Sequence, residues 1–412
     1  MLRPYRDILA RPGALAFSSA GALARLPMSM VGIGIVLMVS DLYGSYGLAG
    51  RVAAAYVLTH AVCSPQLARL VDRRGQARVM RPAIAVTVVA LVGLVVVTLT
   101  HGPPAALFAA AVLAGSSIGS VGALVRARWS HALSDPRQRH TAYALESVLD
   151  EAVFVVGPVL ATILATAVHP AAGLVVPIAA VLTGGLLLFA QHGTEPPPAA
   201  PRAPGAARRR HVLRSGGMGV LAVVFVAMGS IFGATDVATV AFAEEQGNKG
   251  AAGVILAVFA AGSMLSGLGY GARHWVSPLW RRFAVGMVAL ALGVLPFVFV
   301  TSLPALAGVM FVAGFAIAPT LVNGNALVQH FVQPGRLTEG LTWVGTSLGL
   351  GVAVGASVAG AAIDTRGSHG GFQVVVISAV LAFVATLASL RTLRAGTAEP
   401  AGLPLAETPT PR

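Results

Sequence analysis

Residues 67–101 read LARLVDRRGQARVMRPAIAVTVVALVGLVVVTLTH and contain the two signals that decide the fold. The first part of this stretch is basic, whereas residues 82–101 contain no Asp, Glu, Lys or Arg. A helix needs about 20 mainly apolar residues to cross the hydrocarbon core of a bilayer. The stretch therefore predicts a transmembrane helix over 82–101 that enters the membrane directly after a basic segment.

Similar apolar stretches recur along the whole chain. Only 10% of the 412 residues are charged and 56% are hydrophobic, whereas a soluble domain carries about 25% charged residues. We therefore expect an all-α membrane protein of twelve transmembrane helices, with no large soluble domain. The expected helices are 14–40, 47–69, 82–101, 104–127, 141–166, 170–191, 216–242, 248–272, 282–301, 304–329, 338–363 and 371–393.

A polar stretch divides the twelve helices into two groups of six. Residues 192–215 are rich in Pro, Ala and Arg and predict a cytoplasmic linker. It separates an N-terminal six-helix bundle (1–191) from a C-terminal six-helix bundle (216–394). The low hydrophobicity of residues 395–412 predicts a disordered cytoplasmic tail.

The two bundles resemble each other in sequence. Asp41 after the first helix is followed by glycines at 44, 47 and 50, and Glu244 after the seventh by glycines at 247, 250 and 253. Thr141 opens the fifth helix as TAYALES, and Thr338 opens the eleventh as TEGLTWVGT. Parallel six-helix repeats are one way in which secondary transporters build a central cavity. The alternative is that a glycine-rich chain repeats such spacings by chance.

The positively charged residues indicate the orientation in the membrane. Of the 28 Lys and Arg residues, 24 lie at one set of helix ends, in the linker or in the termini. Only Arg51, Lys249 and Arg366 lie on the opposite side, and Arg25 lies within a helix. By the positive-inside rule we expect both termini in the cytoplasm and the protein in the cell membrane. The net charge of +13 then faces anionic lipid, so no nucleic-acid partner is expected.

The basic segment resembles a signature of the major facilitator superfamily, roughly G-x-L-x-D-R-x-G-R. The matching residues are Leu70, Asp72, Arg73, Gly75 and Arg78, with Ala68 in place of the first glycine and the second basic residue displaced by two positions. The resemblance implies two pseudo-symmetric bundles and a cytoplasmic loop that latches them together. A short charged loop can bind helix ends of the other bundle in one state and release them in another. We therefore expect a gating role for this loop.

Further stretches resemble proton-coupled exporters of the same superfamily. Gly157-Pro158 in the fifth helix is similar to the centre of an antiporter motif, although the following glycine pair is absent. Residues 24–27 (ARLP), 142–158 (AYALESVLDEAVFVVGP) and 318–343 (APTL to LTEGLTW) resemble actinobacterial drug or sugar efflux permeases. This resemblance implies a drug:proton antiporter.

The expected first and fifth helices place the ionisable residues Arg25, Glu146, Asp150 and Glu151 inside the membrane. Such residues cost roughly 2.5 to 3.5 kcal/mol each unless they are paired or face water. Arg25 lies about 18 Å into the first helix and cannot lose its proton, so it needs a partner. Glu146 and Asp150 share one face of the fifth helix, whereas Glu151 points about 100° away. We expect an ion pair between Arg25 and Asp150 or Glu146.

Two interpretations of the three acids remain open. Crowded carboxyl groups in a low dielectric resist simultaneous ionisation, so they can bind and release the proton that an exchanger needs. Alternatively, they form a structural ion-pair cluster with Arg126 or Arg128 near the cytoplasmic end.

Other polar residues in the predicted helices are candidates for a transport site. Asp236 lies late in the seventh helix, where it could line the cavity or its outer mouth. His60 could titrate near neutral pH, or it could be satisfied locally.

Candidates for substrate contact are Tyr143, Asn323, Asn325 and Trp343. The two aromatic residues could stack on a flat substrate, and the two asparagines could line the cavity. The alternative for all four is packing and hydrogen bonding between helices.

Three functions follow from these patterns. The first is proton-coupled efflux of small, fairly apolar compounds, and the second is import of a polar solute such as a sugar or organic acid. The third is a non-transporting membrane scaffold or sensor. The sequence has no G-x-x-x-x-G-K-[ST] motif for ATP, no Cys/His cluster and no hydrolytic triad. We expect a monomer that is not an enzyme, with no cofactor or metal, whose partners are a small-molecule substrate, protons and lipid.

Overall fold

The computed structural model describes residues 3–199, 212–248 and 251–397, and all regular structure in these ranges is helical. The first part forms α1 (Arg3–Leu9), α2 (Ala14–Tyr43), α3 (Tyr46–Arg74), α4 (Gln76–Leu99), α5 (Pro104–Ser117), α6 (Val121–Ala132), α7 (Pro136–Ala167) and α8 (Ala172–Ala190). The second part forms α9 (Gly216–Glu245), α10 (Ala251–Ala272), α11 (Leu279–Val294), α12 (Leu303–Gly314), α13 (Ile317–Phe331), α14 (Leu337–Arg366) and α15 (Ser368–Thr397).

The chain is a multi-pass membrane protein. Within the described ranges, eleven helical segments are long and apolar enough to cross a bilayer, if α5–α6, α12–α13 and α11 with the short 3-10 helix Leu295–Phe299 each count as one. The twelfth expected helix is α3, which has 29 residues but more polar side chains, among them Arg51, His60 and Arg69. The all-α fold class predicted from composition is therefore confirmed.

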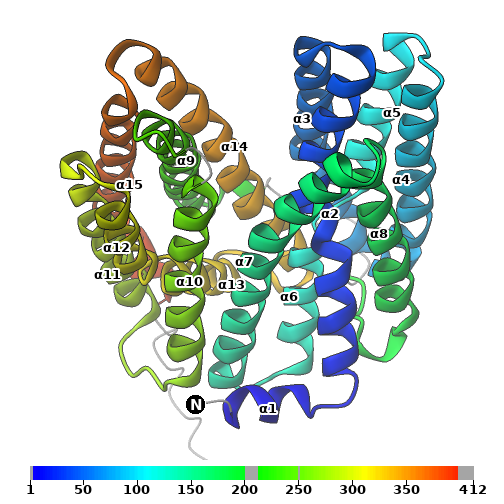
Figure 1. Cartoon of the computed structure of the whole chain (residues 1–412). Coiled ribbons are helices and arrows are strands. Elements are labelled where there is room, and N and C mark those ends of the chain that lie inside the picture. The colour runs from blue at the N-terminus through cyan, green and yellow to red at the C-terminus, as the bar shows by residue number, and fades with distance from the viewer. Residues whose placement is uncertain (1–2, 200–211, 249–250, 398–412) are drawn as a thin grey trace, which may run out of the picture.

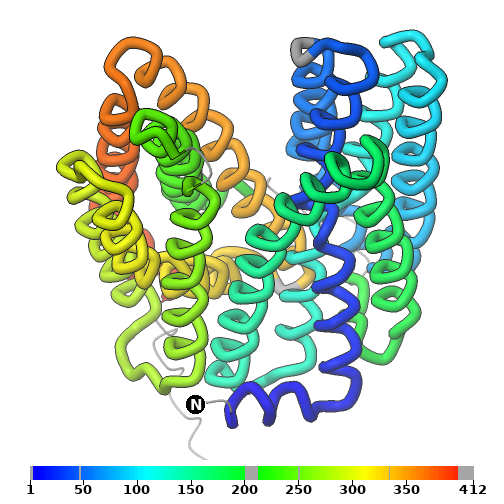
Figure 2. The backbone as a smooth tube through the Cα atoms, viewed as in Figure 1, coloured from blue at the N-terminus to red at the C-terminus, as the bar shows by residue number. Residues whose placement is uncertain are grey.

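The helices pack in two groups, shown in Figure 1. Buried apolar residues of α1 to α8 form most of one cluster, and those of α9 to α15 form most of a second. The groups approach each other at the end that carries α1 and diverge toward the other end (Figure 2). We call these the closed end and the open end. The C-terminal ends of α3 and α10 and the N-terminal ends of α7 and α14 all lie at the closed end.

The expected loop between the second and third membrane helices is almost entirely helical. α3 continues to Arg74 and α4 begins at Gln76, so Gly75 alone makes the turn. Its φ of 92° lies in the region that glycine adopts readily and other residues avoid. The predicted boundaries at 69 and 82 were wrong because hydropathy marks where apolar side chains end, whereas backbone hydrogen bonding continues beyond that point.

The helix expected over 104–127 is interrupted. α5 ends at Ser117 and α6 begins at Val121. Arg126 and Arg128, which we expected near the cytoplasmic end, are buried residues of α6.

Further differences concern the linker and the termini. The lead-in to the first membrane helix forms the short helix α1, which we did not predict, and α15 extends to Thr397, so residues 395–397 are helical. The rest of the expected disordered tail, 398–412, and linker residues 200–211 lie outside the described residues.

The expected sequence repeat has a counterpart in the backbone. Gly44 ends α2 and Gly247 follows α9, with φ values of 63° and 74°. Thr141 is the sixth residue of α7 and Thr338 is the second residue of α14, so both matching sequences lie near the start of a helix.

Helices α9 and α14 pack with their backbones in contact. The contact is made by glycines spaced four apart, Gly229 and Gly233 on α9 and Gly351 and Gly355 on α14. A Cβ atom at any of the four would overlap a backbone carbonyl of the facing helix. Small residues at this spacing allow close approach of membrane helices.

Candidate functional site

A buried ion-pair cluster joins α2 to α7. One Arg25 Nη atom forms an ion pair with Glu146, and the other lies 2.7 Å from Asp150 Oδ1. The side chains of Arg25 and Glu146 are 1% and 0% exposed, whereas Asp150 is 23% exposed. Arg25 therefore contacts both Glu146 and Asp150, the two acids on one face of α7.

The remaining oxygens of the two carboxylates also have strong donors. Glu146 accepts hydrogen bonds from Ser18 Oγ (2.9 Å) and Trp129 Nε1 (2.6 Å). The second oxygen of Asp150 lies 2.7 Å from Arg126 Nη2. Two guanidinium groups therefore neutralise two carboxylates.

Arg128, the other cation considered for this cluster, has different partners. It donates to Gln76 Oε1 (2.8 Å), to the Gln191 carbonyl (2.9 Å) and to Thr194 Oγ1 (2.7 Å). It therefore ties α6 to the end of α8 rather than to the acids of α7.

Glu151 points away from this cluster and toward the other group of helices. Ser263 Oγ on α10 donates to its carboxylate over 2.7 Å. Within the described part of the chain, no Arg or Lys forms an ion pair with Glu151. Of the three acids on α7, it is the one at the interface between the groups and the one whose charge no guanidinium neutralises.

At the closed end, α3 binds the start of α14. Asp72 Oδ2 accepts a hydrogen bond from the Glu339 backbone N–H (2.9 Å), as an acid does at a helix N-terminus. Arg69 Nη2 lies 2.8 Å from the buried Glu339 carboxylate, which also pairs with Arg336. Arg73 and Arg78 are exposed on the surface nearby.

The predicted substrate-contact residues make hydrogen bonds between or within helices. The Tyr143 hydroxyl contacts Ser130 Oγ (2.8 Å) and accepts from Gln329 Nε2 of α13 (2.6 Å). Asn323 Nδ2 donates to the Tyr270 hydroxyl (2.8 Å). Asn325 donates to its own helix, and the half-buried Trp343 packs on the second apolar cluster.

Two other candidates stand apart from the ion-pair cluster. The ring of His60 stacks on Tyr56 with centroids 6.5 Å apart, and its buried Nδ1 has no hydrogen-bond partner among the described residues. Asp236 is exposed on α9 and forms no ion pair with a described residue.

The Gly157-Pro158 pair lies where α7 crosses α2. A Cβ atom at Gly157 would overlap Ser29, and Ser29 Oγ donates to the Val153 carbonyl (2.9 Å). Proline removes one backbone donor, and a hydroxyl of the neighbouring helix supplies another within the same turn region.

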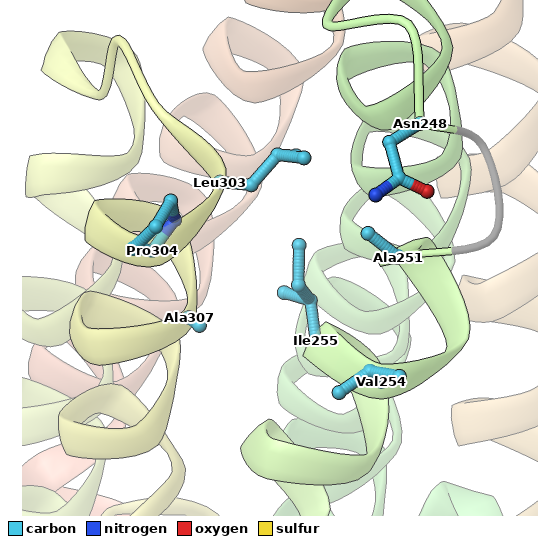
Figure 3. A pocket seen from close by; sticks show the side chains of 7 residues that line it. All are labelled: Asn248, Ala251, Val254, Ile255, Leu303, Pro304 and Ala307. Carbon is cyan, nitrogen blue, oxygen red and sulfur yellow. The ribbon is translucent and has the colours of Figure 1, made fainter.

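A groove elsewhere on the molecule contains none of these residues. Its volume is about 430 Å³, and it lies between the N-terminal ends of α10 and α12 (Figure 3). Its lining consists of Asn248, Ala251, Val254, Ile255, Leu303, Pro304 and Ala307. Among the described residues, no group of three His, Cys, Asp or Glu side chains could hold a metal.

Sequence reasoning missed the neutral donors of the site. Ser18, Trp129 and Ser263 are ordinary residues of apolar helices, and their contacts depend on which helices meet. The buried acids were the available signal, because a carboxylate in a membrane must find donors.

Comparisons with known proteins agree with the geometry. The family model described as Major Facilitator Superfamily matches residues 17–300 and 276–411, and a search of curated proteins finds no match. The solved human organic anion transporter MFSD10 (TETRAN) is similar, with a TM-score of 0.73 and 16% identity over 91% of this chain and 100% of that one. A bacterial homologue of the iron transporter ferroportin, in an outward-facing state, has a TM-score of 0.73 and 15% identity over 92% and 99% of the two chains. At these identities the likeness concerns the fold.

Proposed function

Because the chain belongs to the major facilitator superfamily, we propose that it is a secondary active transporter that exports small, fairly apolar compounds in exchange for protons. Transport would proceed by alternating access, with the N-terminal and C-terminal bundles, 1–191 and 216–394, moving against each other. The contacts between the bundles at the closed end, and their divergence at the open end, support this mechanism.

The distribution of charge supports a cytoplasmic closed end. The N-terminal helix α1, with Arg3 and Arg6 exposed, lies there. The turn from α3 to α4, which carries the exposed Arg73 and Arg78, lies at the same end, where α3 contacts the start of α14. By the positive-inside rule this end faces the cytoplasm, and the described arrangement is then the outward-open state. The similar ferroportin homologue was likewise solved in an outward-facing state.

Glu151 is the observation that supports proton coupling. The charges of Glu146 and Asp150 are neutralised by Arg25 and Arg126, so these acids hold α2, α6 and α7 together. Glu151 has a hydroxyl partner from the opposite bundle instead. A carboxyl that gains or loses its proton at this interface changes the contact between the bundles, which is what coupling requires. We assign the proton to Glu151.

Efflux is preferred over import for two reasons. The Gly157-Pro158 pair and the stretches that resemble drug efflux permeases favour export of apolar compounds. The polar candidates Tyr143 and Asn323 are engaged between helices, which leaves few groups for the hydroxyls of a sugar. Import of a polar solute is the second candidate, and a scaffold or sensor without transport is the third.

Everted membrane vesicles with an acidic lumen test the proposal. Ethidium, chloramphenicol and radiolabelled glucose serve as probes. Export predicts that ethidium or chloramphenicol accumulates in the lumen, and that dissipating the pH gradient abolishes the accumulation. Import predicts glucose accumulation in right-side-out vesicles only. Absence of pH-dependent flux for every probe, in both orientations, would refute proton-coupled transport.

The variant Glu151→Gln tests the assigned residue. Glutamine keeps an oxygen for the Ser263 hydroxyl but cannot bind a proton, so pH-driven accumulation should fall to the level of vesicles without the protein. Asp364→Asn, at an exposed acid near the open end of α14, is the matched control and should transport normally. Full accumulation by Glu151→Gln would remove this residue from the coupling.

A further inference from the structure

The C-terminal end of α10 accepts hydrogen bonds from the opposite bundle. The last carbonyl groups of a helix have no donor within the helix. Thr141 Oγ1 of α7 donates to the Gly271 carbonyl over 2.7 Å, and His140 Nε2 lies 3.2 Å from the Tyr270 carbonyl. Two side chains at the start of α7 therefore bind the end of α10.

A third donor comes from α1, the short helix before the first membrane helix. The Tyr5 hydroxyl donates to the Leu268 carbonyl over 2.7 Å and lies 3.3 Å from the Gly267 carbonyl. Tyr5 and Ile8 are 5% and 1% exposed, whereas Arg6 faces outward. α1 is thus anchored by its apolar side chains and bridges the two bundles at the closed end.

The position of the Tyr5 hydroxyl depends on a glycine of α10. A Cβ atom at Gly271 would meet both the Tyr5 hydroxyl and the Cβ of Ala144. Burial also raises the pKa of Tyr5 to about 12, so the hydroxyl keeps its proton and remains a donor at physiological pH.

The two interfaces at the closed end differ although the repeat relates them. Between α3 and α14, the acid Asp72 at the end of one helix binds the start of the other beside Thr338. Between α10 and α7, the corresponding end of α10 contains no acid at all. Thr141, the counterpart of Thr338, and Tyr5 of α1 make the contact there instead.

We propose that α1 is a clamp that holds the closed end shut, with Tyr5 as its contact to α10. It takes the place that an acidic latch occupies at the other interface. The clamp must leave α10 whenever the closed end opens, so it sets the balance between the two access states. The proposal rests on the alternating access proposed above, but it requires neither proton coupling nor a particular substrate.

Pulsed electron paramagnetic resonance distances in lipid nanodiscs test the clamp. In a Cys63→Ala background, spin labels at Arg137→Cys and Val276→Cys report the closed end, and labels at Thr100→Cys and Thr301→Cys report the open end; all four sites are exposed. Tyr5→Phe removes one hydroxyl and keeps the ring. The ratio of long to short closed-end distances should rise about two- to tenfold, as expected for one lost hydrogen bond.

Tyr43→Phe is the matched control. The Tyr43 hydroxyl also binds carbonyl groups, those of Gly102 (2.7 Å) and Val97 (3.3 Å), but both lie in its own bundle. This variant should leave the closed-end distances unchanged. Thr141→Val, which removes the second donor, should shift them in the same direction as Tyr5→Phe.

An unchanged closed-end distribution in Tyr5→Phe, or an equal shift in Tyr43→Phe, would overturn the clamp. The measurement uses no substrate and no pH gradient. Its outcome is therefore independent of the vesicle assay, and either proposal can fail while the other stands.

Discussion

Arg25 is tolerated in a membrane helix because acidic side chains offset its charge. Its guanidinium contacts two carboxylates of α7, and Glu146 in turn has two further donors. Removing one member of a buried ion pair leaves an uncompensated charge and typically costs about 3–5 kcal/mol. The cluster is therefore expected to matter for stability as well as for function.

Replacing Arg25 should test this directly. Arg25→Met leaves Glu146 buried without its cation, so the midpoint of thermal unfolding in detergent should fall sharply. Arg137→Met, which removes an exposed arginine, should have little effect. Equal midpoints for the two variants would contradict a stabilising role of the cluster.

The indole of Trp129 offers a milder test of the same site. Trp129→Phe deletes the donor to Glu146 but keeps an aromatic ring against Phe17, whose centroid is 4.7 Å away. Hydrogen bonds to charged groups contribute about 1.5–3 kcal/mol, so thermal stability should decrease measurably. Trp275→Phe deletes a bond to a backbone carbonyl and should cost less; the reverse order would argue against a strong hydrogen bond from Trp129 to Glu146.

At this scale the sequence predicted the charged contacts but not the neutral ones. Arg25 had to find an acid, and the spacing of Glu146 and Asp150 placed both on one face. Ser18 and Ser263 contribute hydroxyls that any membrane helix can carry, so nothing local distinguishes them.

Two glycines of α14 differ in how closely the neighbouring helix packs against them. Gly351 lies against the backbone of α9, whereas a methyl group added at Gly349 on the same helix would have no neighbouring atom within 4 Å. The two glycines therefore form a matched pair within two residues of sequence.

Alanine substitutions should separate the two roles of glycine. Gly351→Ala forces the helices apart, and overpacking of this kind costs about 1–3 kcal/mol. Gly349→Ala meets no obstacle and gains up to about 1 kcal/mol of helix propensity. Thermal unfolding should therefore shift downward for the first variant and not for the second, and a common shift would refute the close packing.

The positions of the membrane helices were predicted better than their ends and their internal breaks. The expected break between residues 69 and 82 is reduced to Gly75, because α3 extends to Arg74 and α4 begins at Gln76. Arg and Lys are good helix formers, so a basic stretch ends the apolar pattern without ending the helix.

At the closed end, the α3–α14 and α7–α10 interfaces between the bundles share no residue. Mutations without shared partners usually have additive effects. Asp72→Ala removes the α3 acid that binds the start of α14. This variant should raise the ratio of long to short closed-end distances by a factor of its own. In the double variant with Tyr5→Phe, the two factors should multiply in the same resonance experiment. A double variant whose ratio is no higher than that of either single variant would show that the two interfaces act as one.

The contribution of Tyr5 should be independent of pH over the physiological range. Its pKa in the folded chain is about 12, above the ordinary value of about 10. Because the pKa is raised, the stabilisation from the protonated hydroxyl is fully present when the pH is below the ordinary pKa. It is lost only as the pH rises toward 12. The difference between the parent and Tyr5→Phe should therefore be the same at about pH 6 and about pH 9, and a difference that changes between them would contradict a neutral donor.

For the whole molecule, composition predicted the fold class and the repeat predicted where matching turns occur. Which end is closed could not be predicted, because both access states bury largely the same helices and differ only in contacts between bundles. Those contacts depend on α1 and on the end of α10, and neither has a hydropathy signal.

The cluster around Arg25 also has a consequence for biosynthesis. Arg25 precedes Glu146 by 121 residues, and a ribosome adds about 5–20 residues per second. The arginine therefore reaches the membrane roughly 6–24 seconds before its acid does. During that interval the first membrane helix carries an unpaired cation, at a cost of about 2.5–3.5 kcal/mol. The N-terminal bundle is accordingly expected to settle in the bilayer as a group once α7 has emerged, rather than one helix at a time.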